Sequence, residues 1–169
     1  ALGMMLSLLR NMREVEERCR DNATKDGLVG TELGGKTVGI VGVGKIGMRT
    51  AQLCKAFGCT VLGTGRNPGK KYNDDISRVS LEELLQKSDI VTLHCPLTDE
   101  TRGLISRERI SLMKKGAILI NTARGAIVDS EALADALNSG QIGGAGIDVF
   151  ESEPPIDRKH CLMHCKNTL

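Results

Sequence analysis

Short apolar runs alternate along the chain with segments whose apolar residues recur at helical spacing. The runs are rich in Val and Ile and too uniformly apolar for strands with one wet face, so they predict central strands of a parallel sheet. Strand followed by helix, repeated, requires crossover connections and a sheet covered on both faces. The expected strands are residues 37–43, 59–65, 89–95, 117–123 and 144–150, and the expected helices are residues 46–57, 80–88, 106–115 and 130–140.

Polar residues at the ends of the helical segments mark where the helices begin and end. Ser80, Ser106 and Asp129 stand at N-cap positions, and Gly140 stands at a C-cap position. The whole pattern predicts the α/β class, with a doubly wound parallel sheet and helices on both faces.

The two ends of the chain differ from this core of residues 36–150. Residues 1–22 predict an amphipathic helical arm, which needs a surface to pack on. Residues 151–169 contain Pro154 and Pro155 and predict a linker followed by the start of a last strand. The apolar stripe of the arm consists of Leu2, Met5, Leu6, Leu9 and Met12.

Composition limits the function classes. With 169 residues, 40% of them apolar, the chain is expected to form a single domain. A net charge of +2, one Tyr, two Phe and no Trp argue against a nucleic-acid partner. The opening apolar run is too short to span a bilayer and lacks a basic leader, so we expect no membrane partner and a cytoplasmic location.

Six cysteines, without any sign of secretion, favour reduced thiols over a disulfide framework. The stretch "HCLMHC" holds residue types that bind zinc, at His160, Cys161, His164 and Cys165. Structural zinc sites usually take ligands from two separated segments, so we expect a surface loop here and no metal.

A glycine-rich loop joins the first strand of the core to the next helix. Gly42, Gly44 and Gly47 have G-x-G-x-x-G spacing: the first permits a tight turn, the second lets the backbone approach a pyrophosphate, and the third allows close packing of helix on strand. The helix N-terminus then offers free N–H groups to the anion. A bare structural turn is the alternative, but the flanking strand and helix favour dinucleotide binding and a Rossmann-like sheet.

The second strand ends without the carboxylate that usually binds the ribose hydroxyls of NAD. Gly65 takes its place, and Arg66, Asn67, Lys70 and Lys71 follow. Such a cluster suits a 2′-phosphate, although charged runs are often only solvated loops. We therefore expect NADP to be favoured, with NAD possible.

Two later strands end in side chains that suit substrate chemistry. Arg124 follows the fourth expected strand, and Asp148, Glu151 and Glu153 follow the fifth. An arginine there can hold a substrate carboxylate bidentately, and a carboxylate beside it can orient a histidine acid/base and raise its pKa.

Four stretches together resemble the D-isomer-specific 2-hydroxyacid dehydrogenases: "GKTVGIVGVGKIG", "LHCPLTDETRGLI", "MKKGAILINTARGAIVD" and "GAGIDVFESEPP". The resemblance implies that Arg124 binds substrate and that Glu153 pairs with the catalytic histidine. Alternatively, Asp148 is a turn residue and Glu153 a solvated loop charge. The cofactor contacts implied by the glycine loop, the charged cluster and the resemblance are Gly42, Gly44, Lys45, Ile46, Gly47, Arg66, Asn67, Cys95, Pro96, Thr122, Ala123, Arg124 and Asp148.

The chain departs from the family pattern in what it lacks. The catalytic histidine of the family lies in a T-P-H segment just beyond Leu169, and neither His160 nor His164 lies in that motif. His94 is expected to be a hydrogen-bonded structural residue. The substrate domain of the family is also absent, so we expect this nucleotide-binding domain alone to bind cofactor but to turn over little substrate.

The resemblance implies an NAD(P)-dependent oxidoreductase that acts on a small 2-keto or 2-hydroxy acid, of the glyoxylate/hydroxypyruvate reductase or phosphoglycerate dehydrogenase type. The alternative is a dinucleotide-sensing interaction protein similar to the transcriptional corepressors of the same fold. The apolar stripe of the first helix predicts a homodimer.

Overall fold

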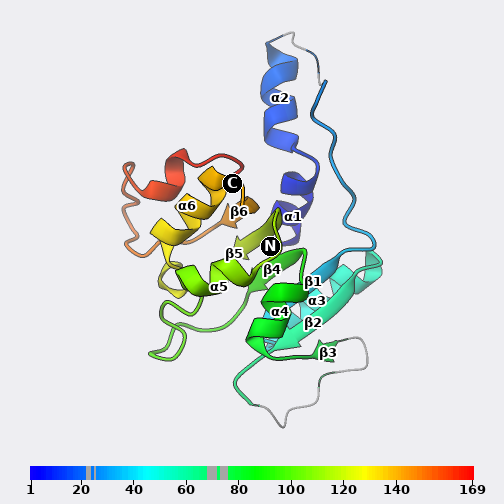
Figure 1. The fold of residues 1–169 in the computed structure, drawn as a ribbon, viewed down its shortest axis with the longest axis vertical. Helices are drawn as coiled ribbons and strands as arrows, with labels where there is room; N and C mark the ends of the chain where they lie inside the picture. The colour runs from blue at the N-terminus through cyan, green and yellow to red at the C-terminus, as the bar shows by residue number, and fades with distance from the viewer. Residues whose placement is uncertain (22–23, 25, 68–71, 73–75) are drawn as a thin grey trace.

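A six-stranded parallel sheet forms the centre of the computed structural model, which describes residues 1–21, 24, 26–67, 72 and 76–169. Its strand order is β3-β2-β1-β4-β5-β6, so the direction of winding reverses between β1 and β4 (Figure 1). The predicted doubly wound α/β fold is confirmed. The strands are β1 (Thr37–Val41), β2 (Thr60–Thr64), β3 (Ser77–Arg78), β4 (Ile90–Leu93), β5 (Ala117–Asn121) and β6 (Ile142–Ile147).

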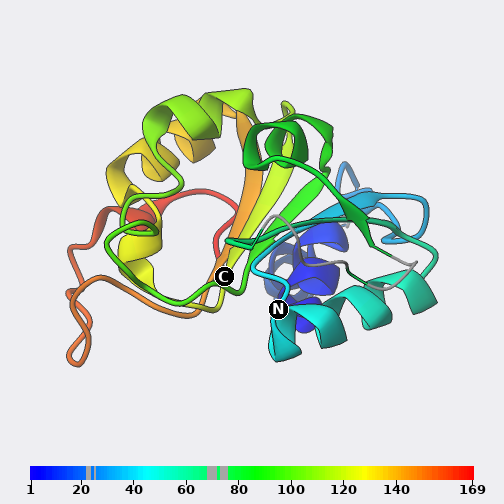
Figure 2. The same ribbon diagram turned by 90° about the horizontal axis from the view of Figure 1, so that it is seen from below.

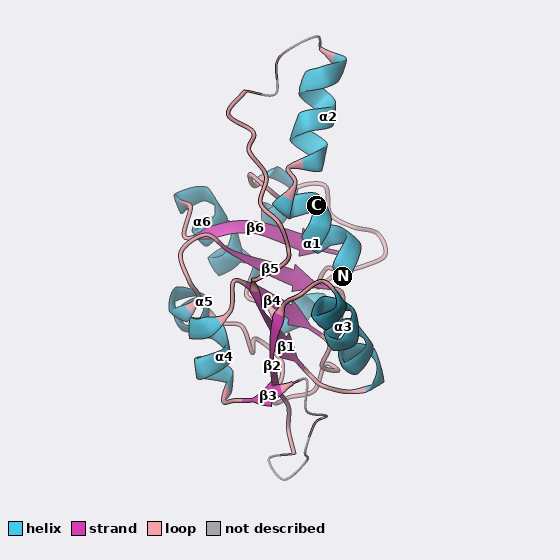
Figure 3. Cartoon of the chain, turned by 90° about the vertical axis from the view of Figure 1, so that its right-hand side faces the viewer, coloured by secondary structure: helices cyan, strands magenta, loops and turns pink. Residues whose placement is uncertain are grey.

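Helices cover both faces of the sheet. α1 (Leu2–Leu9) and α3 (Lys45–Ala56) lie on one face, and α4 (Leu81–Lys87), α5 (Arg107–Leu112) and α6 (Ser130–Ser139) lie on the other (Figures 2 and 3). Successive residues of β1 enter different cores: Ile40 packs on the α1 and α3 side, and Val41 on the α4 side. Burial on both faces is why the strand sequences are uniformly apolar.

The predicted helix caps are confirmed. The Ser80 hydroxyl accepts from the Glu83 amide at 3.1 Å, Asp129 accepts from the Ala132 amide at 3.0 Å, and Ser106 accepts from the Arg109 amide at 3.5 Å. Gly140 ends α6 with a φ of 75°.

The N-terminal arm is two helices rather than one, so the prediction of a single helix was wrong. Asn11 adopts a left-handed conformation with a φ of 50° and separates α1 from α2 (Met12–Arg20). α1 buries Met5 and Leu9, whereas Met12 is 56% exposed. Every residue of α2 is described, and none of them is buried. The helix projects away from the sheet (Figure 1).

The bounds of the last core strand and two short turns differ from the prediction. The last strand of the core was expected at residues 144–150, but β6 begins at Ile142, directly after the turn at Gly140, and Asp148 lies outside it. Residues 167–169 lie in the part of the chain where the start of a last strand was expected, and they run beside β6: the Ala145 amide donates to the Asn167 carbonyl at 2.9 Å. Two 3-10 turns, η1 (Gly125–Ile127) and η2 (Cys161–His164), were also missed. Among the described residues, no helix has the length and apolar composition that crossing a bilayer requires.

Candidate functional site

The three glycines of the loop between β1 and α3 have different surroundings. Gly42 has a φ of 98°, and a Cβ built on it would stand 2.6 Å from the Cys95 amide nitrogen. A Cβ on Gly47 would overlap the Gly42 carbonyl. A Cβ on Gly44, by contrast, meets no heavy atom of the described residues within 4 Å. Gly42 and Gly47 therefore allow the turn itself, while Gly44 leaves its backbone open to a ligand.

The first turn of α3 is suited to an anion. Gly44 is its N-cap, and the first turn contains no acidic residue. Lys45 and Ile46 lie on this turn and are exposed, Ile46 to 73%. The amides of a helix's first turn lack intrahelical partners and carry the positive end of the dipole, so they can donate to a phosphate group.

A cavity of about 510 Å³ adjoins this loop at the carboxyl ends of the strands. It lies where the strand order reverses, which is where open α/β sheets bind ligands. One wall comes from the end of β2, and the opposite wall comes from the segment after β4. Six residues predicted from the sequence line it: Gly42, Gly44, Arg66, Asn67, Cys95 and Pro96.

At the end of β2, Gly65 takes the position of the usual carboxylate. Arg66 and Asn67 are exposed at the rim of the cavity. Lys70 and Lys71, which we also expected near a 2′-phosphate, lie outside the described residues. Tyr72 lines the same wall, although nothing in its sequence neighbourhood indicated this.

The other half of the sheet edge carries the remaining predicted residues, outside the described lining of the cavity. Asn121, at the end of β5, is 1% exposed: it accepts from the Ala123 amide at 3.1 Å and donates to the Arg124 carbonyl at 2.9 Å. The Asp148 amide, just after β6, donates to the Asn121 carbonyl at 3.0 Å. Asn121 thus fixes the turn of residues 122–124 beside Asp148. Its signal in the sequence is a polar residue at the end of an apolar run.

Arg124 and Glu153 lie on neighbouring loops. A Cβ on Gly125 would overlap the backbone of Phe150 and Glu151, so the two loops are in direct contact. Both side chains bond within their own loops: Arg124 donates to the Ala123 carbonyl at 2.7 Å, and Glu153 accepts from the Phe150 amide at 3.1 Å. Both residues are exposed.

Glu151 connects the loop of Glu153 to α6. Its carboxylate accepts from the Ser130 hydroxyl and lies 2.8 Å from Nε2 of His160. Burial acts to raise the pKa of Glu151, but the hydrogen bonds from Ser130 and His160 hold it below its ordinary value. His160, which belongs to the segment with zinc-binding residue types, therefore contributes to this network.

His94 lies in the cavity wall at the end of β4. Its Nε2 is 3.1 Å from the Thr92 hydroxyl, which agrees with the expected hydrogen-bonded structural role. Burial, with a smaller effect from the positive amino terminus, lowers the pKa of His94 to about 4. Burial also raises the pKa of the adjacent Cys95 thiol. Both side chains are therefore neutral at pH 7 and add no charge to the cavity.

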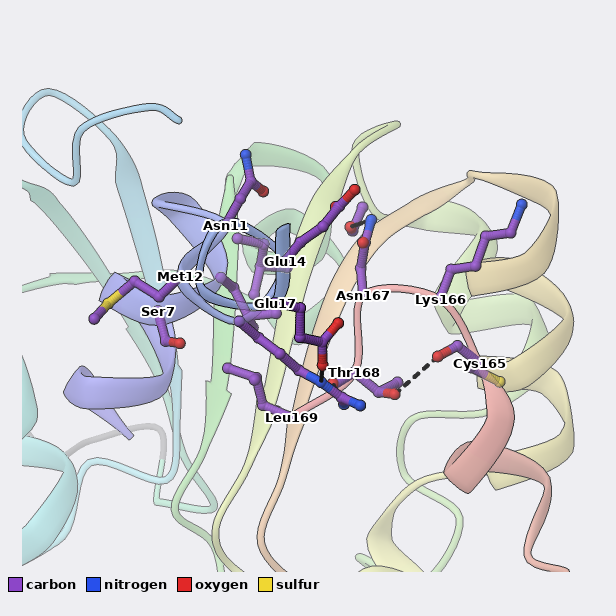
Figure 4. Close-up of a pocket in the computed structure, with 14 residues that line it drawn as sticks. Ser7, Asn11, Met12, Glu14, Glu17, Cys165, Lys166, Asn167, Thr168 and Leu169 are labelled. Carbon is purple, nitrogen blue, oxygen red and sulfur yellow. Dashed lines mark hydrogen bonds and ion pairs between the residues drawn. The ribbon is translucent and has the colours of Figure 1, made fainter. Parts of the chain in front are cut away.

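A second cavity, of about 500 Å³, lies between the N-terminal helices and residues 165–169 (Figure 4). Arg13 reaches across it toward the Thr168 carbonyl at 3.5 Å. Its lining includes Ile118 and Gly143, which lie near the amino ends of β5 and β6. Among its described lining residues there is no predicted site residue.

Comparison with known proteins agrees with this geometry. Residues 2–169 match the family described as D-isomer specific 2-hydroxyacid dehydrogenase, NAD binding domain. Glyoxylate reductase of Aeropyrum pernix is 48% identical over 144 residues, which cover 84% of this chain and 43% of the relative. The 2-hydroxyacid dehydrogenase homolog 2 of Schizosaccharomyces pombe is 44% identical over 155 residues, which cover 90% of this chain and 47% of the relative.

A solved structure shares the fold closely. D-lactate dehydrogenase from Aquifex aeolicus, in complex with NAD and lactic acid, aligns with a TM-score of 0.90 at 36% identity. The alignment covers 99% of this chain and 56% of that one. The chain spans about half the length of the curated relatives it matches.

Proposed function

This chain belongs to the D-isomer specific 2-hydroxyacid dehydrogenases, as their NAD binding domain, and we propose that the whole protein transfers a hydride between a nicotinamide dinucleotide and a small 2-keto or 2-hydroxy acid. The observation that carries the proposal is the open backbone at Gly44, between the N-terminus of α3 and the cavity at the strand switch point. A pyrophosphate needs both features together, because its oxygens must approach amide hydrogens without meeting a side chain.

The residues divide into two groups along the sheet edge. Gly44, Lys45 and Ile46 hold the pyrophosphate, and the cavity between the ends of β2 and β4 receives the adenosine half. The nicotinamide half extends over β5 and β6. Its contacts are Thr122, Ala123, Arg124 and Asp148, while Cys95 and Pro96 stand in the cavity wall between the two halves.

The bound nicotinamide supplies the hydride, or accepts it, at C4 of its ring. Arg124 holds the substrate carboxylate with paired N–H groups, which fixes the 2-carbon beside the cofactor and polarises its oxygen. Glu153 orients an acid/base histidine and keeps its pKa high enough to donate a proton near neutrality. Buried Asn121 keeps the Arg124 turn rigid, and Glu151 keeps the Glu153 loop on α6.

We propose NADP as the favoured cofactor. Support comes from Gly65, which leaves no carboxylate to repel a 2′-phosphate, and from Arg66 at the cavity rim. The test is a calorimetric titration of the chain with NADPH and NADH, alone and with Arg66→Ala. NADPH should bind more tightly, and Arg66→Ala should weaken NADPH about tenfold or more while NADH changes little. Equal affinities in the parent chain, or an unchanged ratio in the variant, would refute the preference.

We propose short acids such as glyoxylate or hydroxypyruvate as the substrates. The name of the Aeropyrum pernix relative, glyoxylate reductase, supports this class. Reduction also suits an NADP-preferring enzyme better than the phosphoglycerate oxidation of other family members, which usually uses NAD. Steady-state assays of the whole protein with NADPH and either acid test the assignment.

We also propose a homodimer in which the two copies of the chain contact each other through the arm and the segment that follows it. α2 buries none of its residues, all of which are described, and helices of nine residues are marginal in water without a packed face. Its i,i+4 ion pairs contribute little, because Arg13–Glu17 and Arg20–Glu16 are exposed and Arg18–Glu14 is only half-buried. Met12 and Val29, 56% and 86% exposed, supply apolar surface for a second copy of the chain.

A further inference from the structure

The side chain of Tyr72 lies on the end of β2, over two glycines. A Cβ built on Gly63 would stand 3.1 Å from Cε2 of Tyr72, and one built on Gly65 would stand 3.0 Å from its hydroxyl oxygen. Residues two apart in a strand share a face, so the ring follows one face of the strand end. The missing side chains at residues 63 and 65 leave the space that the ring takes.

Arg78, on the neighbouring strand β3, holds both the ring and the strand end. Its guanidinium carbon lies 5.0 Å from the centre of the Tyr72 ring, within range of a cation–π contact. Its Nη2 donates to the Gly65 carbonyl at 2.9 Å. One guanidinium therefore fixes the Tyr72 hydroxyl relative to Gly65.

The hydroxyl stands where a carboxylate would begin. NAD-binding chains place an acid at the residue that is Gly65 here, and that acid accepts from the ribose hydroxyls. Its side chain would start at the built Cβ position, 3.0 Å from the Tyr72 oxygen. Tyr72 also lines the cavity on the same wall as Arg66 and Asn67.

We propose that the Tyr72 hydroxyl replaces the missing carboxylate and donates a hydrogen bond to the 2′-phosphate of the adenosine ribose, beside Arg66. The chemistry favours this exchange, because an ionised carboxylate only accepts hydrogen bonds, whereas a phenol also donates them. The assignment rests on the proposed binding of a nicotinamide dinucleotide at this edge and adds a second specificity residue to it.

The test compares two fragments of the cofactor, adenosine 2′,5′-bisphosphate and 5′-AMP, by calorimetry. Tyr72→Phe removes the hydroxyl and keeps the ring. It should weaken the bisphosphate about tenfold, the loss expected for one hydrogen bond to a charged group, and 5′-AMP less than threefold. The matched control is Thr60→Val, which removes an exposed hydroxyl at the opposite end of β2 and should change neither affinity.

The other outcomes separate this proposal from the proposed function. If the parent chain binds NADPH tightly and Tyr72→Phe leaves the bisphosphate affinity within twofold, Tyr72 has no such role and the cofactor assignment stands. An equal loss of affinity for both fragments would also overturn the proposed contact, because the hydroxyl would then bind a part of the nucleotide other than the 2′-phosphate. If the parent binds neither NADPH nor NADH, the proposed function fails and the role of Tyr72 fails with it. Tyr72 is the only tyrosine of the sequence, which has no Trp. Its fluorescence therefore gives an independent measurement of ligand binding beside it.

Discussion

Gly42 and Cys95 approach so closely that a Cβ on the first would stand 2.6 Å from the amide nitrogen of the second. Gly42 directly follows β1 and Cys95 follows β4, so this contact closes the sheet edge at the point where the strand order reverses. The turn that presents Gly44 to a ligand depends on it.

Gly42→Ala should destabilise the fold. The new methyl group would meet the Cys95 amide, and the φ of 98° disfavours any side chain. Strained positions of this kind cost about 1–3 kcal/mol, so the free energy of unfolding in urea should fall by that amount. Gly3→Ala is the control, since its Cβ meets no heavy atom of the described residues within 4 Å. Equal stability of Gly42→Ala and the parent would contradict the tight turn.

Asn121→Leu should loosen the turn that carries Arg124. The Ala123 amide and the Arg124 carbonyl would both lose their partner, which costs about 1–3 kcal/mol for buried groups. Denaturant unfolding measures the loss, and faster hydrogen exchange at the Ala123 amide should accompany it. The control Asn138→Leu changes an exposed amide on α6 and should stay within about 0.5 kcal/mol of the parent. A stable Asn121→Leu with an unchanged turn would show that Asn121 does not fix Arg124.

Acid should destabilise the protein through His94. Its folded pKa of about 4 lies below its ordinary value of 6.5, because burial disfavours the charged form. The stabilising contribution is therefore present above pH 6.5 and is lost as the pH falls from 6.5 toward 4. Allowing for the partly exposed ring, the loss is about 1–2 kcal/mol. The free energy of unfolding, measured at several pH values, should fall less between pH 6.5 and 4 in His94→Gln than in the parent chain. The same dependence on pH in the two proteins would contradict this role of His94.

The arm should control the oligomeric state. Size-exclusion chromatography with light scattering should give a dimer for the parent chain and a monomer for Met12→Glu combined with Val29→Glu. These changes place charges on an exposed apolar residue of the arm and on one of the segment that follows it. Met163→Glu, at an exposed Met of η2 far from the arm in sequence, should remain a dimer. A parent chain that stays monomeric at high concentration would exclude this interface.

The sequence predicted the core well because its signals are local. β1, β4 and β5 are buried on both faces and read as apolar runs, while Ser80 and Asp129 bond to amides three residues away. Gly42 and Gly47 were recognised from their spacing together with the strand before them and the helix after them, because a tight turn between strand and helix depends on consecutive residues.

The parts that were missed depend on contacts distant in sequence. The break at Asn11 separates α1, which buries Met5 and Leu9, from α2, which buries no residue, and the apolar stripe through Met12 did not indicate it. β3 has only two residues, too few for any periodicity. Tyr72 was missed because its position over Gly63 and Gly65 is a tertiary contact that no spacing rule describes.

The most direct test of the account is the binding of NADPH to the parent chain and to Gly44→Ala, measured by calorimetry with unfolding in parallel. A methyl group at residue 44 meets no heavy atom of the described residues within 4 Å, so the fold should be unaffected, but the methyl would stand in the path of the pyrophosphate. We predict one cofactor bound per parent chain and an affinity at least about tenfold lower in Gly44→Ala, at unchanged stability. No binding to the parent chain, or equal affinity in the stable variant, would contradict the account.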